Sequence, residues 1–484
     1  MRHSVLLGAL LPGLAALAGV EPQGPAGPPQ EPAPVIQLAV TPGRPEFRAL
    51  KYTLLPDPLD LTHGNAAPLW MRAGERASNV QRDLFQGPNK VVAPVGTPLN
   101  PEGKQVALQD LPKDEIRSYL AHFSTTLRIA DQAAHCDECD WELPPMTMQD
   151  FDFPLEDIQH MRTIAALLHT RFLLELSEKR FDDAIHTMQI NFALARDVGK
   201  GQTLIQDLVG IAIGAITFGE VEQWEQVPGS PNLFWALTDL PAPIVDVGPA
   251  MRSELTPLYR SFPPLKEVLR TKGALSEEET NRIVAELFKD WSTLIGQDVP
   301  EWQRKLGAAT LVLKTYPTAK KFLKDHGRTD EQLDAMPAAQ VVLLYFAEQY
   351  DEIKDDYLKW LNVPPWQARP GLEEVGKKVR IIGPTGNPIL LLLPAVEKVY
   401  GARVRIEYQA DYLRCAEALR YYAMTHDGKP PASLADVKLP LPADPYTGEG
   451  FGKFYSVQAD GTAVFEVPPP PNMPPLLGRC FVLK

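Results

Sequence analysis

The sequence predicts a mainly α protein in which a central helical array precedes a small C-terminal α+β module. Three observations lead to this prediction. Apolar residues recur every three or four positions through most of residues 113–370, prolines separate these periodic runs, and short strand-like runs with turn signals appear only near the C-terminus. We therefore divide the chain into residues 1–18, 19–48, 49–112, 113–370 and 371–484.

The centre of the predicted array is a helical hairpin formed by residues 155–176 and 181–194. Both runs carry apolar residues at helical spacing, and glycines follow the second run as helix-ending residues. The spacing of Leu173, Phe181 and Ala184 looks like a tetratricopeptide-type unit, in which a small residue lies where two helices cross. An ordinary αα-hairpin is the alternative interpretation.

Residues 204–218 form the most apolar run after the N-terminus. The run includes Gln206 and Asp207 and is shorter than the roughly 20 apolar residues that a bilayer requires. Its Gly210 and Gly214 are four residues apart, which permits close helix packing. We expect a buried core helix, with a membrane or dimerisation segment as the alternative.

The N-terminus has the pattern of a secretory signal peptide. Arg2 precedes an apolar run from Val5 to Val20, and small residues end at Ala18 with the spacing of a cleavage site. We expect residues 1–18 to be removed and the chain to be exported, to the periplasm or outside the cell. An uncleaved anchor is the alternative. Residues 19–48 are rich in proline and glycine, which predicts a disordered tether, with one strand at Val35–Val40.

The composition narrows the range of partners. The chain has 48 basic and 61 acidic residues and a net charge of −13. Phosphate contacts need concentrated Lys and Arg, so the chain-wide balance argues against nucleic acid and against anionic membrane surfaces. Proline accounts for 48 of the 484 residues, and its clusters between periodic runs indicate where helices end and connecting segments begin.

The remaining elements follow from periodicity and capping signals. Residues 49–112 are predicted to be irregular, including a long loop over 84–111. Capping-box patterns begin at Ser276 and Thr329. Further helices are predicted over residues 114–134, 276–295, 301–326 and 337–360.

The C-terminal module begins with a long predicted helix over residues 389–425. Two short strands, Lys453–Val457 and Ala463–Val467, are joined at Asp460-Gly461, which is a hairpin signal. The order of helix, proline-rich turn and hairpin is similar to the soluble part of type II secretion pseudopilins. The methylation signal and long apolar stem of that family are absent from this sequence.

Three longer runs carry a second resemblance. Ala49–Trp70, Pro228–Pro241 and Met336–Val342 resemble an exported family of planctomycete proteins with no assigned function. The resemblance covers most of the mature chain. It implies export, but it implies no activity, and no functional residue can be transferred from it.

Four cysteines are present, and two of them, Cys136 and Cys139, form a C-x-x-C pattern. In an exported chain this pattern favours a local disulfide or two structural thiols, with a metal site or a redox pair as alternatives. His135 is adjacent and makes His135, Cys136 and Cys139 the candidate metal ligands, although zinc requires further ligands. Cys415 and Cys480 are candidates for a second disulfide.

The residues around the C-x-x-C pattern argue against two of its possible chemistries. Asp137, Glu138 and Asp140 are expected to raise the thiol pKa and so suppress the reactive thiolate. Covalent haem attachment requires histidine where Asp140 stands. No strand precedes the pattern as it would in a thioredoxin-like fold.

No local motif identifies a reaction. The sequence has no His-Glu-x-x-His, no Gly-x-Ser-x-Gly and no phosphate-binding loop. We therefore assign no catalytic residue and no cofactor, and neither the substrate nor the oligomeric state follows from the sequence.

The predicted function is a non-enzymatic binding or scaffold protein of the cell envelope, because helical arrays present extended surfaces to protein partners. We expect no nucleic-acid partner and no stable membrane insertion after signal cleavage. An enzyme with a site that lacks local motifs is one alternative. A secretion-machinery component is another, which an exposed apolar stripe on residues 389–425 would favour and burial of that helix would exclude.

Overall fold

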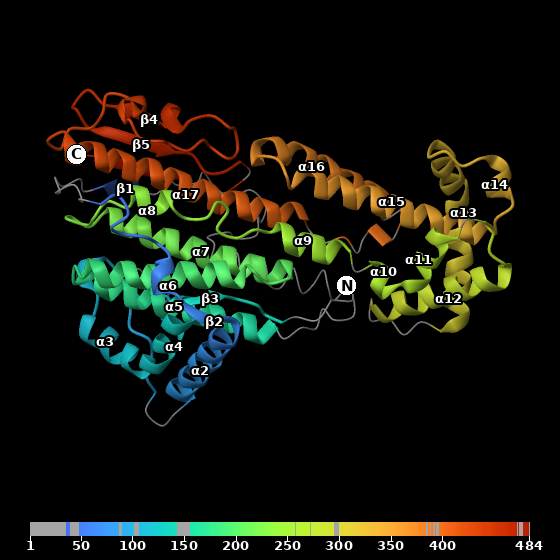
Figure 1. Ribbon diagram of the computed structural model, residues 1–484, viewed down its shortest axis with the longest axis horizontal. Helices are drawn as coiled ribbons and strands as arrows, with labels where there is room; N and C mark the ends of the chain where they lie inside the picture. Colours follow the sequence, from blue (N-terminus) through green and yellow to red (C-terminus); the bar gives the residue numbers. More distant parts are fainter. Residues whose placement is uncertain are drawn as a thin grey trace, which may run out of the picture. The chain divides into compact units, whose positions relative to one another are not determined.

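The chain folds into two compact units, each of which is described separately (Figure 1). Unit 1 contains Gly248–Val399. Unit 2 contains the described residues up to 142, residues 155–247 and the residues from 400 onward. The computed structural model describes residues 35–38, 48–86, 90–100, 106–142, 155–256, 258–271, 273–294, 300–383, 386–387, 389–390, 393, 396–471, 473 and 478–483.

The fold is mainly α with a small C-terminal α+β module, as the sequence predicts. The two units divide the predicted array at Val247, and the chain returns to unit 2 within the long C-terminal helix. The predicted signal peptide lies outside the described residues. The predicted tether does too, except for Arg48 and the four residues that form strand β1.

Unit 2 contains about half of the helices and all of the strands that the structure describes. Its helices are α2 (Ala67–Gln86), α3 (Lys113–His122), α4 (Ser124–Ala134), α5 (Leu155–Ser177), α6 (Phe181–Val198), α7 (Leu204–Glu225), α8 (Phe234–Thr238) and most of α17 (Val396–Thr425). Its strands are β1 (Val35–Leu38), β2 (Thr62–Asn65), β3 (Cys136–Glu138), β4 (Tyr455–Val457), β5 (Ala463–Val467) and β6 (Arg479–Leu483).

Helices α5 and α6 form the predicted hairpin, and α7 packs against both of them. The predicted core helix is confirmed, because α7 buries most of its apolar side chains. A Cβ atom on Gly210 would lie 2.7 Å from the carbonyl oxygen of Ala195, so glycine is what lets α7 approach α6 this closely. By length and hydropathy α7 alone among the described helices could cross a membrane, but 72% of its apolar window is buried, as in the core helix of a folded unit.

The prediction of an irregular segment over residues 49–112 is wrong in part, because residues 67–86 form α2. This helix buries Trp70 together with small side chains, including Ala73 and Ala77, at helical spacing. Gly74 lies where α2 meets α5, and a Cβ atom there would come within 2.7 Å of the Cβ of His160. The core face of α2 is therefore built from alanine and glycine, which gives a weak apolar signal in the sequence.

The C-terminal sheet has the strand order β1-β6-β5-β4. Strands β4 and β5 form the predicted antiparallel hairpin, with Tyr455 opposite Phe465. Strand β6 extends the sheet by pairing antiparallel to β5, and β1 then pairs parallel to β6. Buried Phe465 and Phe481 form the apolar face of this sheet, and Tyr412 of α17 contacts Phe481.

Buried charged groups join α7 to the C-terminal part of unit 2. Tyr412 of α17 donates a hydrogen bond to Glu222, and the Nε of Arg479 lies 3.0 Å from both Glu222 oxygens. Glu225, one turn further along α7, is fully buried, and neither of its oxygens has a hydrogen-bond partner among the described residues. Burial and the nearby Glu417 carboxylate raise the Glu225 pKa well above its usual value. Folding therefore favours the protonated form of Glu225.

Unit 1 is built from helices around α15. Its elements are α9 (Gly248–Leu255), α10 (Leu258–Ser261), α11 (Pro263–Arg270), α12 (Glu277–Leu294), α13 (Glu301–Asp325), α14 (Asp330–Asp334), α15 (Ala338–Trp360) and α16 (Pro365–Ile382). The capping box at Thr329 is confirmed, since the Thr329 hydroxyl accepts from the Gln332 amide and the Gln332 side chain accepts from the Thr329 amide. The Ser276 hydroxyl likewise accepts from the backbone N–H of Glu279 at the start of α12.

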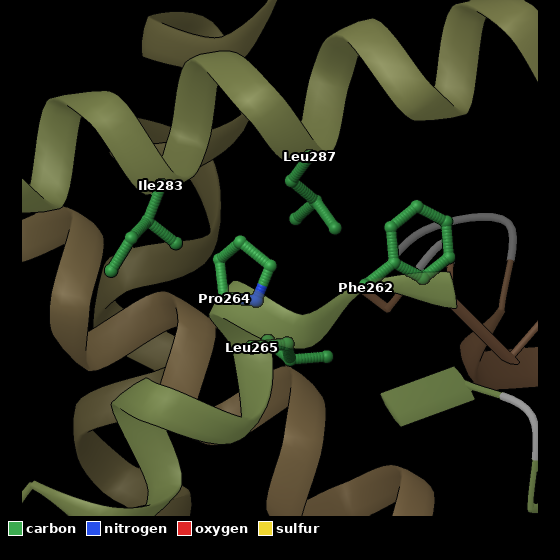
Figure 2. A pocket seen from close by; sticks show the side chains of 5 residues that line it. All are labelled: Phe262, Pro264, Leu265, Ile283 and Leu287. Atoms are coloured by element: carbon green, nitrogen blue, oxygen red, sulfur yellow. The ribbon is translucent and has the colours of Figure 1, made fainter. Parts of the chain in front are cut away.

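A small apolar crevice lies between α11 and α12 in unit 1 (Figure 2). It has no room for a water molecule and is lined by Phe262, Pro264, Leu265, Ile283 and Leu287. Ligand pockets usually measure about 300–1,000 Å³ and include a few polar groups. This crevice is smaller, and all five lining residues are apolar, so it is a packing defect of the unit rather than a candidate site.

Candidate metal centre

A cluster of one carboxylate and two imidazoles in unit 2 lies where the end of α4 meets α6. Asp131 and His135 are one helical turn apart, so their side chains project from the same face. His186 approaches from α6, with its Nε2 atom 2.9 Å from Oδ1 of Asp131. One donor atom from each of the three side chains lies within 4.8 Å of the others.

Local packing explains why these polar side chains meet. Helix α4 buries Ile129, Ala130 and Ala133 in the core of unit 2, which leaves Asp131 at the edge of the helix. Helix α6 buries Ile185 and Thr187, and His186 between them faces the same edge. The contact of α4 with α6 therefore places the cluster at the border between core and solvent.

The cluster is partly exposed. The side chains of Asp131 and His186 are each 38% exposed, and that of His135 is 22% exposed. The imidazole rings of His135 and His186 have centroids 5.7 Å apart. The three side chains are therefore partly accessible to solvent, whereas the Oδ1 atom of Asp131 that faces His186 is itself buried.

Hydrogen bonds orient the two imidazole rings differently. The Nδ1 of His135 lies 2.8 Å from the backbone carbonyl oxygen of Asp131 and can donate a proton to it. This bond leaves Nε2 of His135 as the atom for a metal, and metal-binding histidines commonly fix their other nitrogen in this way. His186 instead uses Nε2 for the contact with the Asp131 carboxylate.

The electrostatics are those of an acid–imidazole pair. The Asp131 hydrogen bond and charge raise the pKa of His186, against the opposing effect of burial. The same hydrogen bond holds the pKa of Asp131 below its usual value, with a smaller contribution from the charge of His135. A metal ion bound to His186 has to compete with a proton for the imidazole nitrogen, so its binding will depend on pH.

Two imidazoles and a carboxylate suit zinc and the other divalent transition metals. Ligands at about 2.0–2.2 Å from a tetrahedral zinc lie about 3.3 Å from one another. The donor atoms here fall within 4.8 Å, so small rotations of half-exposed side chains would bring them into range. Three protein ligands would leave at least one coordination position open, as in catalytic zinc sites.

The structure separates His135 from the cysteines with which the sequence grouped it. After His135 the chain turns into strand β3, which pairs with β2. The thiol of Cys136 lies 3.4 Å from the carbonyl oxygen of Gln132, and the thiol of Cys139 lies 3.8 Å from that of Asp197. The candidate centre is therefore formed by His135 with Asp131 and His186, and not with Cys136 and Cys139.

All four cysteines lie in described segments and are free thiols. The structure contains neither a Cys136–Cys139 bridge nor the predicted pairing of Cys415 with Cys480. Burial is the main reason that the Cys136 pKa is raised and that of Cys139 reaches about 12, and Asp197 contributes in both cases. The predicted suppression of the thiolate is confirmed in direction, but burial outweighs the neighbouring acids that the sequence singled out.

Asp197 holds the C-x-x-C segment and α2 onto the end of α6. Its carboxylate accepts from the indole N–H of Trp70, and its backbone carbonyl accepts from the indole N–H of Trp141. The side chain itself is 1% exposed and is paired with Arg196 and Lys200. These contacts make the C-x-x-C segment a structural element beside the candidate centre.

Sequence reasoning missed Asp131 and His186. The Asp-x-x-x-His spacing of Asp131 and His135 was a readable signal, because residues four apart share a helix face. His186 is distant in sequence, and only the packing of α4 against α6 brings it in. Two other histidines, His160 and His169, lie on α5 outside the centre; His169 has its Nδ1 3.0 Å from the buried carboxylate of Glu220.

Comparisons of the chain with protein-family models, with curated proteins and with solved structures find no match.

Proposed function

We propose that this chain is a non-enzymatic binding protein of the cell envelope that holds a divalent transition metal at Asp131, His135 and His186. The observation that carries the proposal is the convergence of one carboxylate and two imidazoles within 4.8 Å. The partial exposure of all three side chains supports it, because a bound metal would keep a position open to solvent. That position would take water or a donor atom from a protein partner.

Export remains part of the proposal and is supported by the signal-like N-terminus. A role in secretion machinery is not part of it. None of the large exposed apolar side chains of the described residues lies on α17, so this helix presents no apolar stripe to a pilus-like partner.

An enzyme built on the same centre is the second candidate function. The observation that favours it is that three protein ligands leave an open coordination position, where zinc lowers the pKa of a bound water to about 7. Metal-dependent turnover of ester or phosphate substrates by the full chain, lost on substitution of Asp131, would replace the binding proposal with this one.

The test is a zinc titration of the metal-free full-length protein by competition with a chromogenic chelator. Asp131→Asn and His186→Gln are expected to weaken zinc binding by more than about a hundredfold, since even groups that only support a ligand are worth about 10–100-fold. His63→Gln is the matched control, because His63 forms a similar pair with Asp137, with Nδ1 and Oδ2 3.1 Å apart, but the described residues offer this pair no third ligand.

Cobalt substitution supplies a second readout. Cobalt absorption typical of nitrogen and oxygen ligands should appear with the native chain and the His63→Gln variant. It should disappear in the two ligand variants while their circular dichroism remains native. Zinc affinity that is equal in all four proteins would overturn the proposal.

A further inference from the structure

Helix α13 of unit 1 carries an apolar stripe on its solvent side. Trp302, Leu306 and Leu313 are 64%, 61% and 75% exposed, respectively. Their spacing of four and seven residues puts them on one face, with exposed Ala309 between them. The opposite face packs against α15 and buries Ala308, Thr315, Ala319 and Leu323. Single exposed apolar residues are ordinary on protein surfaces, but three aligned large ones mark a contact face.

The same helix is basic in an otherwise acidic chain. Its 25 residues include six Lys or Arg and two acidic residues, whereas the whole chain has a net charge of −13. At 100° per residue, Lys314 and Lys321 lie along one flank of the stripe and Lys305 lies along the other. Lys305 pairs with Glu301. Lys314 and Lys321 are exposed, and neither has an ion-pair partner in the part of the chain that the structure describes.

This combination indicates what covers the stripe. Helices that lie in the plane of a membrane surface place Trp and Leu at the headgroup boundary and Lys or Arg on their polar sides. A second copy of α13 is a poorer occupant, because pairing the stripes would bring the basic flanks of both copies together. We infer that the exposed face of α13 docks on the surface of an anionic phospholipid bilayer.

The inference goes beyond the metal centre and does not depend on it, because α13 belongs to unit 1 and the centre to unit 2. It also refines the expectation drawn from composition. The chain-wide negative charge argues against anionic membranes, but the lipid would meet only the local surface of α13. Lys320 and Lys324 pair with Asp330 and Asp334 of α14, so the positive charge offered to lipid comes from Lys314 and Lys321. Charges further away than a Debye length of about 8 Å are largely screened at physiological salt.

The experiment is co-sedimentation of the full-length protein with phosphatidylcholine vesicles prepared with and without phosphatidylglycerol. Binding is expected only when phosphatidylglycerol is present, and it should weaken at high salt. Lys314→Ala and Lys321→Ala should each lower the partition constant about fivefold, the equivalent of about 1 kcal/mol per basic residue. Leu306→Ser should lower it about tenfold or more, because a buried leucine side chain contributes about 1.5–3 kcal/mol.

Leu59→Ser is the matched control, because Leu59 is 92% exposed but belongs to unit 2. It should leave vesicle binding unchanged. Trp302 supplies a second readout: its fluorescence should shift to shorter wavelength with phosphatidylglycerol vesicles, and Trp302→Phe should remove that change.

Three results would each overturn the inference. The first is equal binding to both vesicle types, and the second is binding that Leu306→Ser and the lysine variants leave intact. The third is self-association that Leu306→Ser abolishes in the absence of lipid, which would assign the stripe to an interface between copies. Because the substituted side chains are exposed, the variants should keep the thermal stability of the native chain.

Discussion

Replacement of Glu222 by alanine should destabilise unit 2 strongly. The Glu222 carboxylate accepts from the Tyr412 hydroxyl and from Arg479, and its residue is only 8% exposed. Glu222→Ala would leave a fully buried phenol hydroxyl and a mostly buried guanidinium without this partner. Removal of one member of a buried ion pair costs about 3–5 kcal/mol. Urea unfolding of the full chain, followed by circular dichroism, measures the change.

Glu225 is the matched control because it lies on the same helix, one turn away, and is also buried. It makes no hydrogen bond within the described residues, and its pKa is raised by burial. Folding therefore favours the protonated form of Glu225. Its contribution to stability is complete below the unfolded-state pKa of about 4.3 and is lost as pH rises through the pKa of the folded state. Glu225→Gln should match the native stability at low pH and exceed it at neutral pH.

The reasoning would be refuted by either of two results. One is a loss below about 1 kcal/mol for Glu222→Ala, which is the size of an ordinary exposed ion pair. The other is a Glu225→Gln variant that is as unstable as Glu222→Ala at every pH, because that would mean the Glu225 carboxylate is ionised and paired in the fold.

Three further outcomes are expected. Gly210→Ala should destabilise the chain by about 1–3 kcal/mol in thermal or urea unfolding, because the new Cβ would meet backbone atoms of α6. Gly219→Ala is the control: this glycine has open space around it, so the change should be neutral or stabilising by up to about 1 kcal/mol. Equal effects of the two substitutions would contradict close packing of α7 against α6 at Gly210. Cys139 should react with iodoacetamide at pH 8 more than about a hundredfold slower than a free thiol, because its pKa is about 12. Mass-spectrometric mapping of the alkylated cysteines measures this rate, and rapid labelling of Cys139 would contradict the prediction. Zinc affinity should fall as pH falls through the His186 pKa, which Asp131 raises above 6.5; a pH-independent chelator competition would exclude His186 as a ligand.

Much of the fold was readable from the sequence because most helices of this protein bury large side chains at helical spacing. The hairpin of α5 and α6, the buried helix α7 and the C-terminal β-hairpin follow from such local signals. Helix α2 was missed because its core face consists mainly of small residues, whose periodicity carries little hydrophobic contrast. The parallel pairing of β1 with β6 joins the two ends of the chain, and no local pattern encodes it.

The candidate centre was only partly readable for a related reason. His135 was grouped with Cys136 and Cys139 in the sequence, but its side chain lies with those of Asp131 and His186 in the structure. Helix α4 ends at Ala134, and the thiols of Cys136 and Cys139 in the segment that follows lie against the backbone carbonyls of Gln132 and Asp197. The lysines that flank the apolar stripe of α13 were missed for another reason, because the net charge of the whole chain does not reveal the charge of one local surface.

The most direct test of the metal centre is the metal content of the full-length protein after equilibration with zinc and gel filtration, measured by native mass spectrometry. We predict one tightly bound zinc per native chain near neutral pH and none in the Asp131→Asn variant. We also predict loss of zinc from the native chain below the ordinary histidine pKa of about 6.5. Zinc retained equally by the native chain and by Asp131→Asn, or by neither, would contradict the assignment of Asp131, His135 and His186 as its ligands.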